Sequence, residues 1–369
     1  MTESAPSDRS ARLGTTLRRW LLPRSVAAAL AAVLLAFLVG AVLIALVGVN
    51  PFAAYAILFE ASLGSVNGLA ETAIRTVPLA LCGMGIALAF RAGVFNVGAE
   101  GQLYVGGLAA GVTGLALAGT PQPLLLLAMA VAAMVGGALW SGLAGWLKLR
   151  FRADELITTI MLNYIAIFAA SYLLHGLLRD PASPLAQTAR LSLDARLPVI
   201  MPMSRLHLGI VVVVLLAGLT QLFLWRSIDG FRFRAVGQNA RAAANAGIDV
   251  PRIVALAFVV CGAFAGLAGF MEVAGVQRRM IENLSPGYGY TAIIVALLGN
   301  TNPLGVLLAA VLFAALQIGS STMESAVGVP GALTTIIQAL VVLFLIAQNA
   351  LPLLIARLRR PAAPKGERS

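Results

Sequence analysis

The chain has 369 residues, of which 60% are hydrophobic and only 11% are charged. This composition excludes a soluble globular protein, because there is too little polar surface to cover one, and it indicates a protein that crosses a membrane several times. The net charge of +11 would suggest nucleic-acid binding in a soluble chain, so the placement of the basic residues must decide what it means here.

Long apolar runs define the expected transmembrane segments. A bilayer core about 30 Å thick needs about 20 apolar residues per helix. By this measure the sequence predicts an all-α polytopic membrane protein with about ten transmembrane segments, some of them broken or re-entrant, at 25–49, 70–90, 97–119, 123–147, 156–178, 206–225, 251–275, 289–299, 303–322 and 331–350. The first run is too long for the core of a signal peptide, so we expect an uncleaved anchor.

The basic residues favour one orientation in the membrane. With a cytoplasmic N-terminus, 19 of the 26 Lys and Arg residues fall inside and 6 outside, and Arg75 lies within the second segment. This excess predicts that both termini are cytoplasmic. It also accounts for most of the net charge, so no nucleic-acid partner is expected. The resulting organisation is a membrane domain at 25–350 with an outer loop at 179–205, between basic cytoplasmic tails at 1–24 and 351–369.

The second and fifth predicted transmembrane segments each contain polar or charged side chains. Glu71 and Arg75 are four residues apart, so on a helix they would lie one above the other, and we expect them to pair; a role in gating is the alternative. Thr159 and Asn163 share a face of the fifth segment, which begins near Glu155. Asn163 needs a hydrogen-bond partner, either on another helix or on a solute.

Residues 91–107 combine polar side chains with glycine between two apolar runs. Asn96, Glu100 and Gln102 lie here among five glycines. Because irregular backbone at membrane depth survives only where protein or a water-filled cavity satisfies it, this stretch predicts a broken helix that lines a pathway. An intramembrane carboxylate is a functional candidate. Alternatively, Glu100 stabilises the N-terminus of the helix that restarts after Asn96.

A second interruption is expected near the C-terminal end of the membrane domain. The apolar segment 289–299 is too short to cross a bilayer alone. It follows a Pro-Gly-Tyr-Gly-Tyr sequence at 286–290 and precedes Gly-Asn-Thr-Asn-Pro at 299–303. These flanks predict a half-helix or a re-entrant element.

The longest internal cytoplasmic segment, 226–250, contains an alanine-rich stretch. Asn239 is a good N-cap, residues 240–246 favour helix, and Gly247 followed by Pro251 would end it. A helix this short is marginal in water, so we expect it to dock against a partner. The alternative is a solvated loop whose arginines only enforce topology.

The sequence contains no recognisable catalytic or metal-binding pattern. Phosphate-loop, zinc-protease, serine-hydrolase and Cys-x-x-Cys motifs are all missing. Cys82 and Cys261 lie within separate apolar runs and are expected to be buried free thiols, and His175 and His207 lack partner ligands. We therefore expect no cofactor, no metal and no nucleotide-hydrolysing site. An intramembrane enzyme is the least favoured of the functional hypotheses.

Four stretches together carry a resemblance to a known family. Residues 95–102, 156–164, 235–247 and 287–305 resemble, in this order, the permease subunits of ABC importers in the ribose/nucleoside branch of the branched-chain amino acid permease superfamily. The sequence is most similar to bacterial nucleoside permeases of the guanosine or purine type, which carry an Asn-x-Gly-x-Glu-Gly-Gln pattern like that of residues 96–102. Ala240 departs from the family, where many relatives carry proline.

The resemblance implies a type II ABC importer-like membrane domain in the inner membrane that imports nucleosides. It implies a cytoplasmic ABC ATPase, a second homologous permease subunit, forming a heterodimer, and an extracytoplasmic substrate-binding lipoprotein as partners. The substrate pathway is expected to involve Phe95, Asn96, Glu100, Gln102, Asn163, Tyr164 and Tyr288. The helix that couples to the ATPase is expected to use Arg234, Gly237, Asn239, Arg241, Ala243, Ala244 and Gly247. The alternatives are a ribose-type sugar permease and an ATP-independent secondary carrier.

Overall fold

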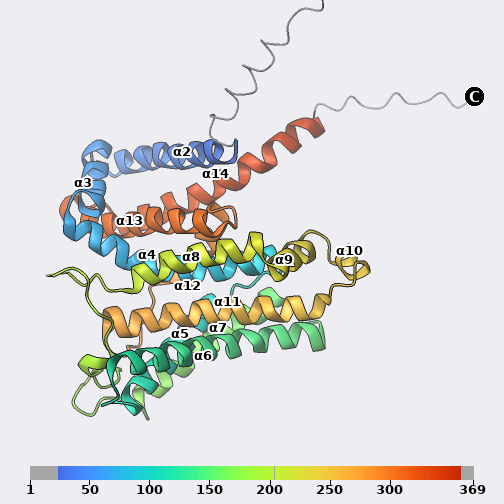
Figure 1. Ribbon diagram of the computed structural model, residues 1–369. Helices are drawn as coiled ribbons and strands as arrows, with labels where there is room; N and C mark the ends of the chain where they lie inside the picture. The colour runs from blue at the N-terminus through green and yellow to red at the C-terminus, as the bar shows by residue number, and fades with distance from the viewer. Residues whose placement is uncertain (1–23, 203, 359–369) are drawn as a thin grey trace, which may run out of the picture. The chain divides into compact units, whose positions relative to one another are not determined.

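Two long helices, α4 (Val66–Arg91) and α11 (Val250–Phe270), are the most enclosed of the membrane-length helices in the computed structural model, which describes residues 24–202 and 204–358 (Figure 1). The apolar stretch of α4 is 83% buried, and that of α11 with its extension to Gln277 is 67% buried. By contrast, α6 (Gln122–Phe151), α7 (Glu155–His175) and α8 (Gly209–Arg226) are each only 28% buried. Most of the surface of these three outer helices is therefore open to lipid or to partner chains.

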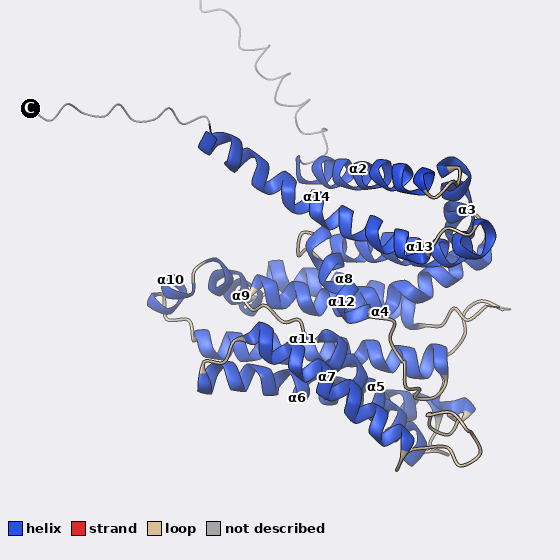
Figure 2. Cartoon of the chain, turned by 180° about the vertical axis from the view of Figure 1, so that it is seen from behind, coloured by secondary structure: helices blue, strands red, loops and turns tan. Residues whose placement is uncertain are grey.

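Small residues allow the inner helices to approach closely. α5 (Ala99–Ala116) and α6 lie beside α11, and α7 packs against α5 and α6 (Figures 1 and 2). A Cβ added at Gly266 of α11 would meet the Ala133 carbonyl of α6, and one added at Gly106 of α5 would meet the backbone of Gly266. In lipid, the hydrophobic effect does not drive helices together. Transmembrane helices therefore associate through van der Waals packing, and small residues favour it because they let the backbones approach closely.

Both predicted interruptions are present as irregular backbone between helices. Residues 92–98 separate α4 from α5. Past α11, a π-helical segment at Met271–Gln277 leads through a loop to α12 (Tyr288–Leu298), and a tight turn leads on to α13 (Pro303–Val327). Asn300 and Thr301 in that turn both have positive φ, at 52° and 50°. The 11-residue length of α12 agrees with the predicted half-helix.

The described residues form two compact units. The larger comprises Tyr55–Ala326 and contains all the elements above. In the smaller unit, α2 (Arg24–Leu46) packs against α14 (Gly331–Leu358). α3 (Pro51–Leu63) begins in the smaller unit and continues into the larger. Of the expected basic tails, residues 1–23 and 359–369 lie outside the described residues, and α14 runs to Leu358, beyond the predicted limit of the membrane domain at 350.

The structure supports a multi-span membrane protein but does not confirm ten spans. Within the described residues six helices are long and apolar enough to cross a bilayer, or seven if α2 and α3 are one bent span. α5 is absent from the six because Glu100 and Gln102 lie in its first turns, and α12 is too short.

Segment 226–250, which we expect to be cytoplasmic, is more structured than its sequence suggested. The predicted alanine-rich helix is present as α10 (Ala240–Asn245), with the Asn239 Oδ1 accepting from the Ala242 amide at 3.0 Å. Gly247 ends it with φ +80°. A second helix, α9 (Ile228–Gln238), precedes it and was not predicted. α9 buries Phe233 and Val236, so the segment is anchored to the bundle rather than free in solvent.

Candidate functional site

The first interruption is held in place by side chains from α7. Asn163 Oδ1 accepts from the Gly101 amide at 2.8 Å, and its Nδ2 donates to the Val97 carbonyl at 3.0 Å. One turn earlier, the Thr159 hydroxyl accepts from the Val97 amide at 3.3 Å. Of the two possible partners left open for Asn163, the structure shows hydrogen bonds to another part of the bundle. These bonds place residues 97–101 beside the first three turns of α7.

Asn96 and Gln102 bind within the same interruption. Asn96 Oδ1 accepts from the Gly98 amide at 2.8 Å and from Gln102 Nε2 at 3.2 Å, while its Nδ2 donates to the Ser141 hydroxyl of α6 at 3.2 Å. Asn96, Gln102 and Asn163 are at most 1% exposed. The Gln102 Oε1 is buried without a hydrogen-bond partner in the described part of the chain. Ser141 was not singled out from the sequence, because a lone serine in an apolar helix carries no distinguishing signal.

Glu100 joins the two interruptions. Its Oε2 accepts from the Gly289 amide at 2.6 Å, in the first turn of α12, although Glu100 itself lies in the first turn of α5. A Cβ added at Gly289 would meet the backbone of Ala99 and Glu100. One carboxylate therefore lies between the N-terminal ends of two helices, where both sets of peptide dipoles favour a negative charge. Glu100 therefore does stabilise a helix N-terminus, which was the alternative given by the sequence. The amide that it binds, however, belongs to α12 and not to its own helix.

The aromatic candidates divide by exposure. Phe95 and Tyr164 are 45% and 50% exposed, whereas Tyr288 is 6% exposed. Phe95 stacks on Phe90 with ring centroids 4.8 Å apart. Asn163 Nδ2 lies 3.4 Å from the hydroxyl of Tyr290, a half-exposed ring of α12. Phe95, Tyr164 and Tyr290 thus present accessible ring surface near the buried polar groups, and Tyr288 does not.

Tyr288 instead faces a buried carboxylate that the sequence analysis missed. Glu272 lies in the π-helical segment, is 2% exposed and is hydrogen-bonded to Tyr288. Its position within a long apolar run was a signal that could have been used, because ionisable residues there are rare. π-helical turns inside α-helices occur frequently at functional sites.

The predicted coupling residues occupy different environments. Arg241, Ala244 and Gly247 are exposed on or just after α10, but Ala243 is only 4% exposed and packs within the chain. Gly237 of α9 lies against the end of α4, because a Cβ added there would meet the Arg91 carbonyl and the Gly93 amide nitrogen. The segment that contains α10 is therefore in direct contact with the start of the first interruption.

Arg234, the remaining predicted coupling residue, faces an aromatic ring. Its guanidinium lies 4.4 Å from the centroid of the Trp225 ring, and that of Arg91 lies 5.8 Å from the same ring. Arg91 also donates to the carbonyl oxygens of Thr301 and Asn300, at 3.2 and 3.1 Å. Arg91 thus links the end of α4 to the turn after α12, a role that its sequence position alone did not reveal.

The predicted pairing of Glu71 with Arg75 is wrong. Glu71 instead accepts two hydrogen bonds from Arg205, in the loop that precedes α8, at 3.1 and 2.7 Å. The two-point geometry of a guanidinium on a carboxylate is stronger than a single contact along one helix. An arginine in a loop was free to take this position, and spacing within one helix could not show it.

Acid is expected to weaken the fold through His207, just before α8. Burial lowers the pKa of His207 from 6.5 to about 4, so the unfolded chain binds a proton at higher pH than the folded chain does. The stabilising contribution of the neutral ring is complete above pH 6.5 and is lost as the pH falls towards 4. At pH 5 we expect His207 alone to contribute a loss of about 2 kcal/mol in the free energy of unfolding, measured as the difference between the wild type and His207→Gln in denaturant titrations at pH 7 and pH 5.

Two variants check this assignment. His207→Gln should lose much of the pH dependence, whereas His175→Gln should keep it, because the His175 side chain is 60% exposed. An equally steep acid loss in His207→Gln would show that another group is responsible.

Comparison with known proteins places this arrangement in a family. The family described as the branched-chain amino acid transport system permease component matches residues 68–346. The chain is 40% identical to the glucose ABC transporter permease protein TsgB13 of Haloferax volcanii over 327 residues, 86% of each chain. It is 37% identical to the guanosine ABC transporter permease protein NupP of Bacillus subtilis, covering 90% of this chain and 97% of NupP.

A third relative is the nucleoside ABC transporter permease protein NupB of Lactococcus lactis subsp. cremoris. It is 31% identical, over 87% of this chain and 91% of NupB. Because the family match spans most of the sequence and includes both interruptions as well as α9 and α10, the chain belongs to the branched-chain amino acid transport system permease family.

Proposed function

We propose that this chain is the membrane-spanning permease subunit of an ABC importer that moves nucleosides into the cytoplasm with ATP hydrolysed on a partner subunit. The observation that carries the proposal is the similarity to the guanosine permease NupP, which covers nearly all of both chains. In this proposal the chain contributes the pathway and the coupling surface and has no nucleotide-hydrolysing site of its own.

The fold suggests where the partners bind. The exposed surface of α10, with Arg241 and Ala244, would contact the cytoplasmic ABC ATPase. An exposed apolar stripe on α6, formed by Leu124, Leu127, Val131, Val135 and Leu139, is available to a second homologous permease subunit. An extracytoplasmic substrate-binding lipoprotein would deliver the solute to the outer loop at 179–205.

The membrane arrangement follows the same proposal. Ten helices cross or enter the inner membrane of a bacterium: α2, α4, α5, α6, α7, α8, α11, α12, α13 and α14. α5 and α12 are the incomplete ones, and both termini are cytoplasmic. This topology rests on the excess of basic residues in the expected cytoplasmic segments.

The solute is proposed to pass over the first interruption. The rings of Phe95 and Tyr164 provide flat exposed surface for a nucleobase, and Asn96, Glu100, Gln102 and Asn163 lie behind them. These four polar residues are buried and bonded to the chain, so they would reach the solute only when the interruption rearranges. Tyr288 would act through Glu272 rather than by stacking.

Uptake by the reconstituted complex tests the function. Proteoliposomes that contain this chain, its ATPase and the second permease, supplied with the binding lipoprotein, should accumulate labelled guanosine only when ATP is present on the ATPase side. ATP-independent uptake by this chain alone would instead support a secondary carrier and contradict the proposal.

Sugar import is the second candidate, because the glucose permease TsgB13 is 40% identical to this chain. Stacking separates the two solutes: a nucleobase gains about 1–3 kcal/mol from π-stacking on an aromatic ring, and a simple sugar has no aromatic ring of its own to stack. Uptake of guanosine, ribose and glucose by the same proteoliposomes would decide between them.

Removal of the Tyr164 ring is expected to affect nucleosides selectively. Tyr164→Ala should raise the KM for guanosine about tenfold, since loss of one stacked ring costs roughly 1–3 kcal/mol. The matched control is Tyr172→Ala, which removes a 79% exposed ring two turns further along α7. Equal effects of the two substitutions on guanosine uptake would remove Tyr164 from the pathway.

A further inference from the structure

A pocket of about 570 Å³ lies between α9, α10 and the ends of α4 and α8, and its position relative to the membrane is informative. Arg91 is the last residue of α4, and Trp225 is the second-last residue of α8. Both helices are long and apolar enough to span a bilayer. A pocket at the ends of two such helices is expected at the level of the lipid headgroups, on the side that the basic residues predict to be cytoplasmic. Its volume is within the range of about 300–1,000 Å³ typical of small-ligand sites.

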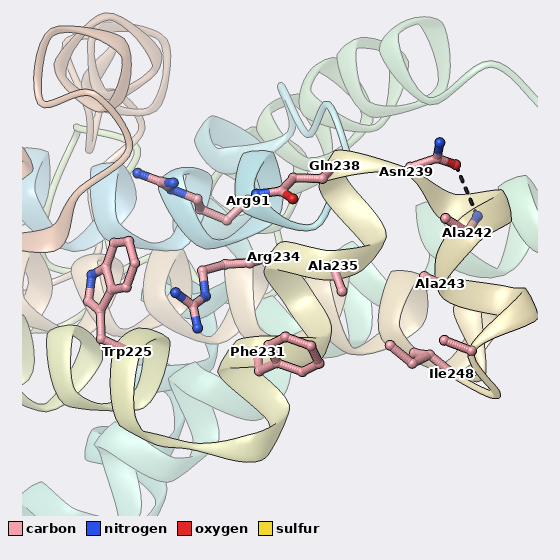
Figure 3. A pocket seen from close by; sticks show the side chains of 11 residues that line it. Arg91, Trp225, Phe231, Arg234, Ala235, Gln238, Asn239, Ala242, Ala243 and Ile248 are labelled. Atoms are coloured by element: carbon pink, nitrogen blue, oxygen red, sulfur yellow. Dashed lines mark hydrogen bonds between the residues drawn. The ribbon is translucent and has the colours of Figure 1, made fainter.

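The pocket concentrates positive charge that the protein does not neutralise. Figure 3 shows Arg91 and Arg234 extending towards Trp225 from different helices. Four ion pairs are found within the described residues, and neither arginine belongs to one of them. The bonds of Arg91 go to backbone carbonyls, and Arg234 makes a 3.4 Å contact with the Gly230 carbonyl. Two guanidiniums on one indole ring, without a carboxylate, are suited to an anion.

Apolar surface adjoins the charged part of the pocket. Trp225 and Phe231 are 46% and 58% exposed at its lining. The exposed residues Leu215, Leu219 and Leu222 continue from Trp225 along one face of α8. A soluble phosphate would not contact this apolar stripe, whereas the acyl chain of a phospholipid would pack against it. Basic pockets on the cytoplasmic side of membrane helices bind anionic headgroups in this way.

We propose that this pocket binds an anionic phospholipid, with its headgroup phosphate between Arg91 and Arg234 and an acyl chain on the exposed face of α8. The bound lipid would brace α9 against the ends of α4 and α8. This assignment goes beyond the proposed import function and does not depend on which solute is transported.

Native mass spectrometry of the full-length chain, purified in mild detergent, tests the proposal. Phosphatidylglycerol is added as the probe and phosphatidylcholine as the neutral comparison. The wild type should retain phosphatidylglycerol selectively, and Arg234→Gln should reduce its retention about tenfold, the loss expected for one charge-assisted phosphate contact. Arg232→Gln is the matched control, because it removes the same charge from α9, but from a residue that pairs with Asp229 outside this pocket.

Other results would overturn the proposal in distinct ways. Equal retention in Arg234→Gln and the wild type excludes the site, as does equal loss in Arg232→Gln. Displacement of phosphatidylglycerol by millimolar inorganic phosphate would make the ligand a free anion. Unchanged lipid retention in Arg234→Gln together with loss of the copurifying ATPase would identify the occupant as a carboxylate of that partner. Arg234→Lys keeps the positive charge but lacks the planar guanidinium, so it should lose lipid retention only in part. This variant replaces Arg234→Gln in the test if the Gln variant does not fold.

Discussion

Replacement of Glu100 by alanine is expected to lower the free energy of unfolding by about 3 kcal/mol or more. The substitution leaves the Gly289 amide at the start of α12 without its acceptor at membrane depth, where no bulk water can replace it. It also removes the negative charge that faces the N-terminal ends of α5 and α12. Thermal unfolding of the detergent-purified chain, with denaturant titration for the magnitude, would measure the loss.

Glu100→Gln separates the structural role from a transport role. Glutamine keeps an acceptor for the Gly289 amide but loses the charge, so we expect a smaller loss of about 1 kcal/mol. If Glu100 also meets the solute when the interruption rearranges, uptake by this variant should fall far more than its stability does. If the variant is less stable but takes up solute at the wild-type rate, Glu100 has only a structural role at the two helix N-termini. Glu60→Gln, an exposed acid in α3, should change the free energy of unfolding by less than about 0.5 kcal/mol.

The two interruptions could be predicted from the sequence, but their contact could not. Polar side chains and glycines within apolar runs identify each stretch on its own, because such residues are costly in lipid. The hydrogen bond that joins them spans 189 residues, from Gly289 to Glu100. A single sequence carries no signal for a pairing at that separation, so Glu100 was assigned to the substrate pathway, with the end of its own helix as the alternative, and its contact with α12 was missed.

Segment 226–250 shows which structural features local sequence patterns can predict. Asn239 and Gly247 marked the limits of α10 correctly, because caps and positive-φ glycines act within a few residues. α9 was missed although Gly230, Phe233 and Val236 recur at a spacing of three and all are buried. Its four charged or amide residues made it look like a solvated loop. The burial of Ala243 likewise depends on packing that composition does not record.

Enlargement of Gly237 is expected to block transport while leaving the ATPase attached. A methyl group in Gly237→Ala would overlap the Arg91 carbonyl and the Gly93 amide nitrogen, so α9 would have to move away from the end of α4. Overpacking of this kind costs about 1–3 kcal/mol. Gly93 has φ +73°, which favours glycine, so the interruption can adapt little at that point. If the full cost falls on the transport step, guanosine uptake should drop by up to about a hundredfold.

The measurement compares uptake with ATPase activity in the same proteoliposomes. Because α10 and its exposed Arg241 and Ala244 are unchanged, the ATPase should still copurify and hydrolyse ATP, so the ratio of solute moved to ATP consumed should fall. Gly218→Ala in α8 is the matched control, since a Cβ there meets nothing within 4 Å and alanine only improves helix propensity. A normal ratio in Gly237→Ala would show that motion does not pass from α9 to the interruption at this contact. Loss of the ATPase from the complex would instead mean that Gly237 shapes the docking surface, which contradicts the proposed route through Gly93.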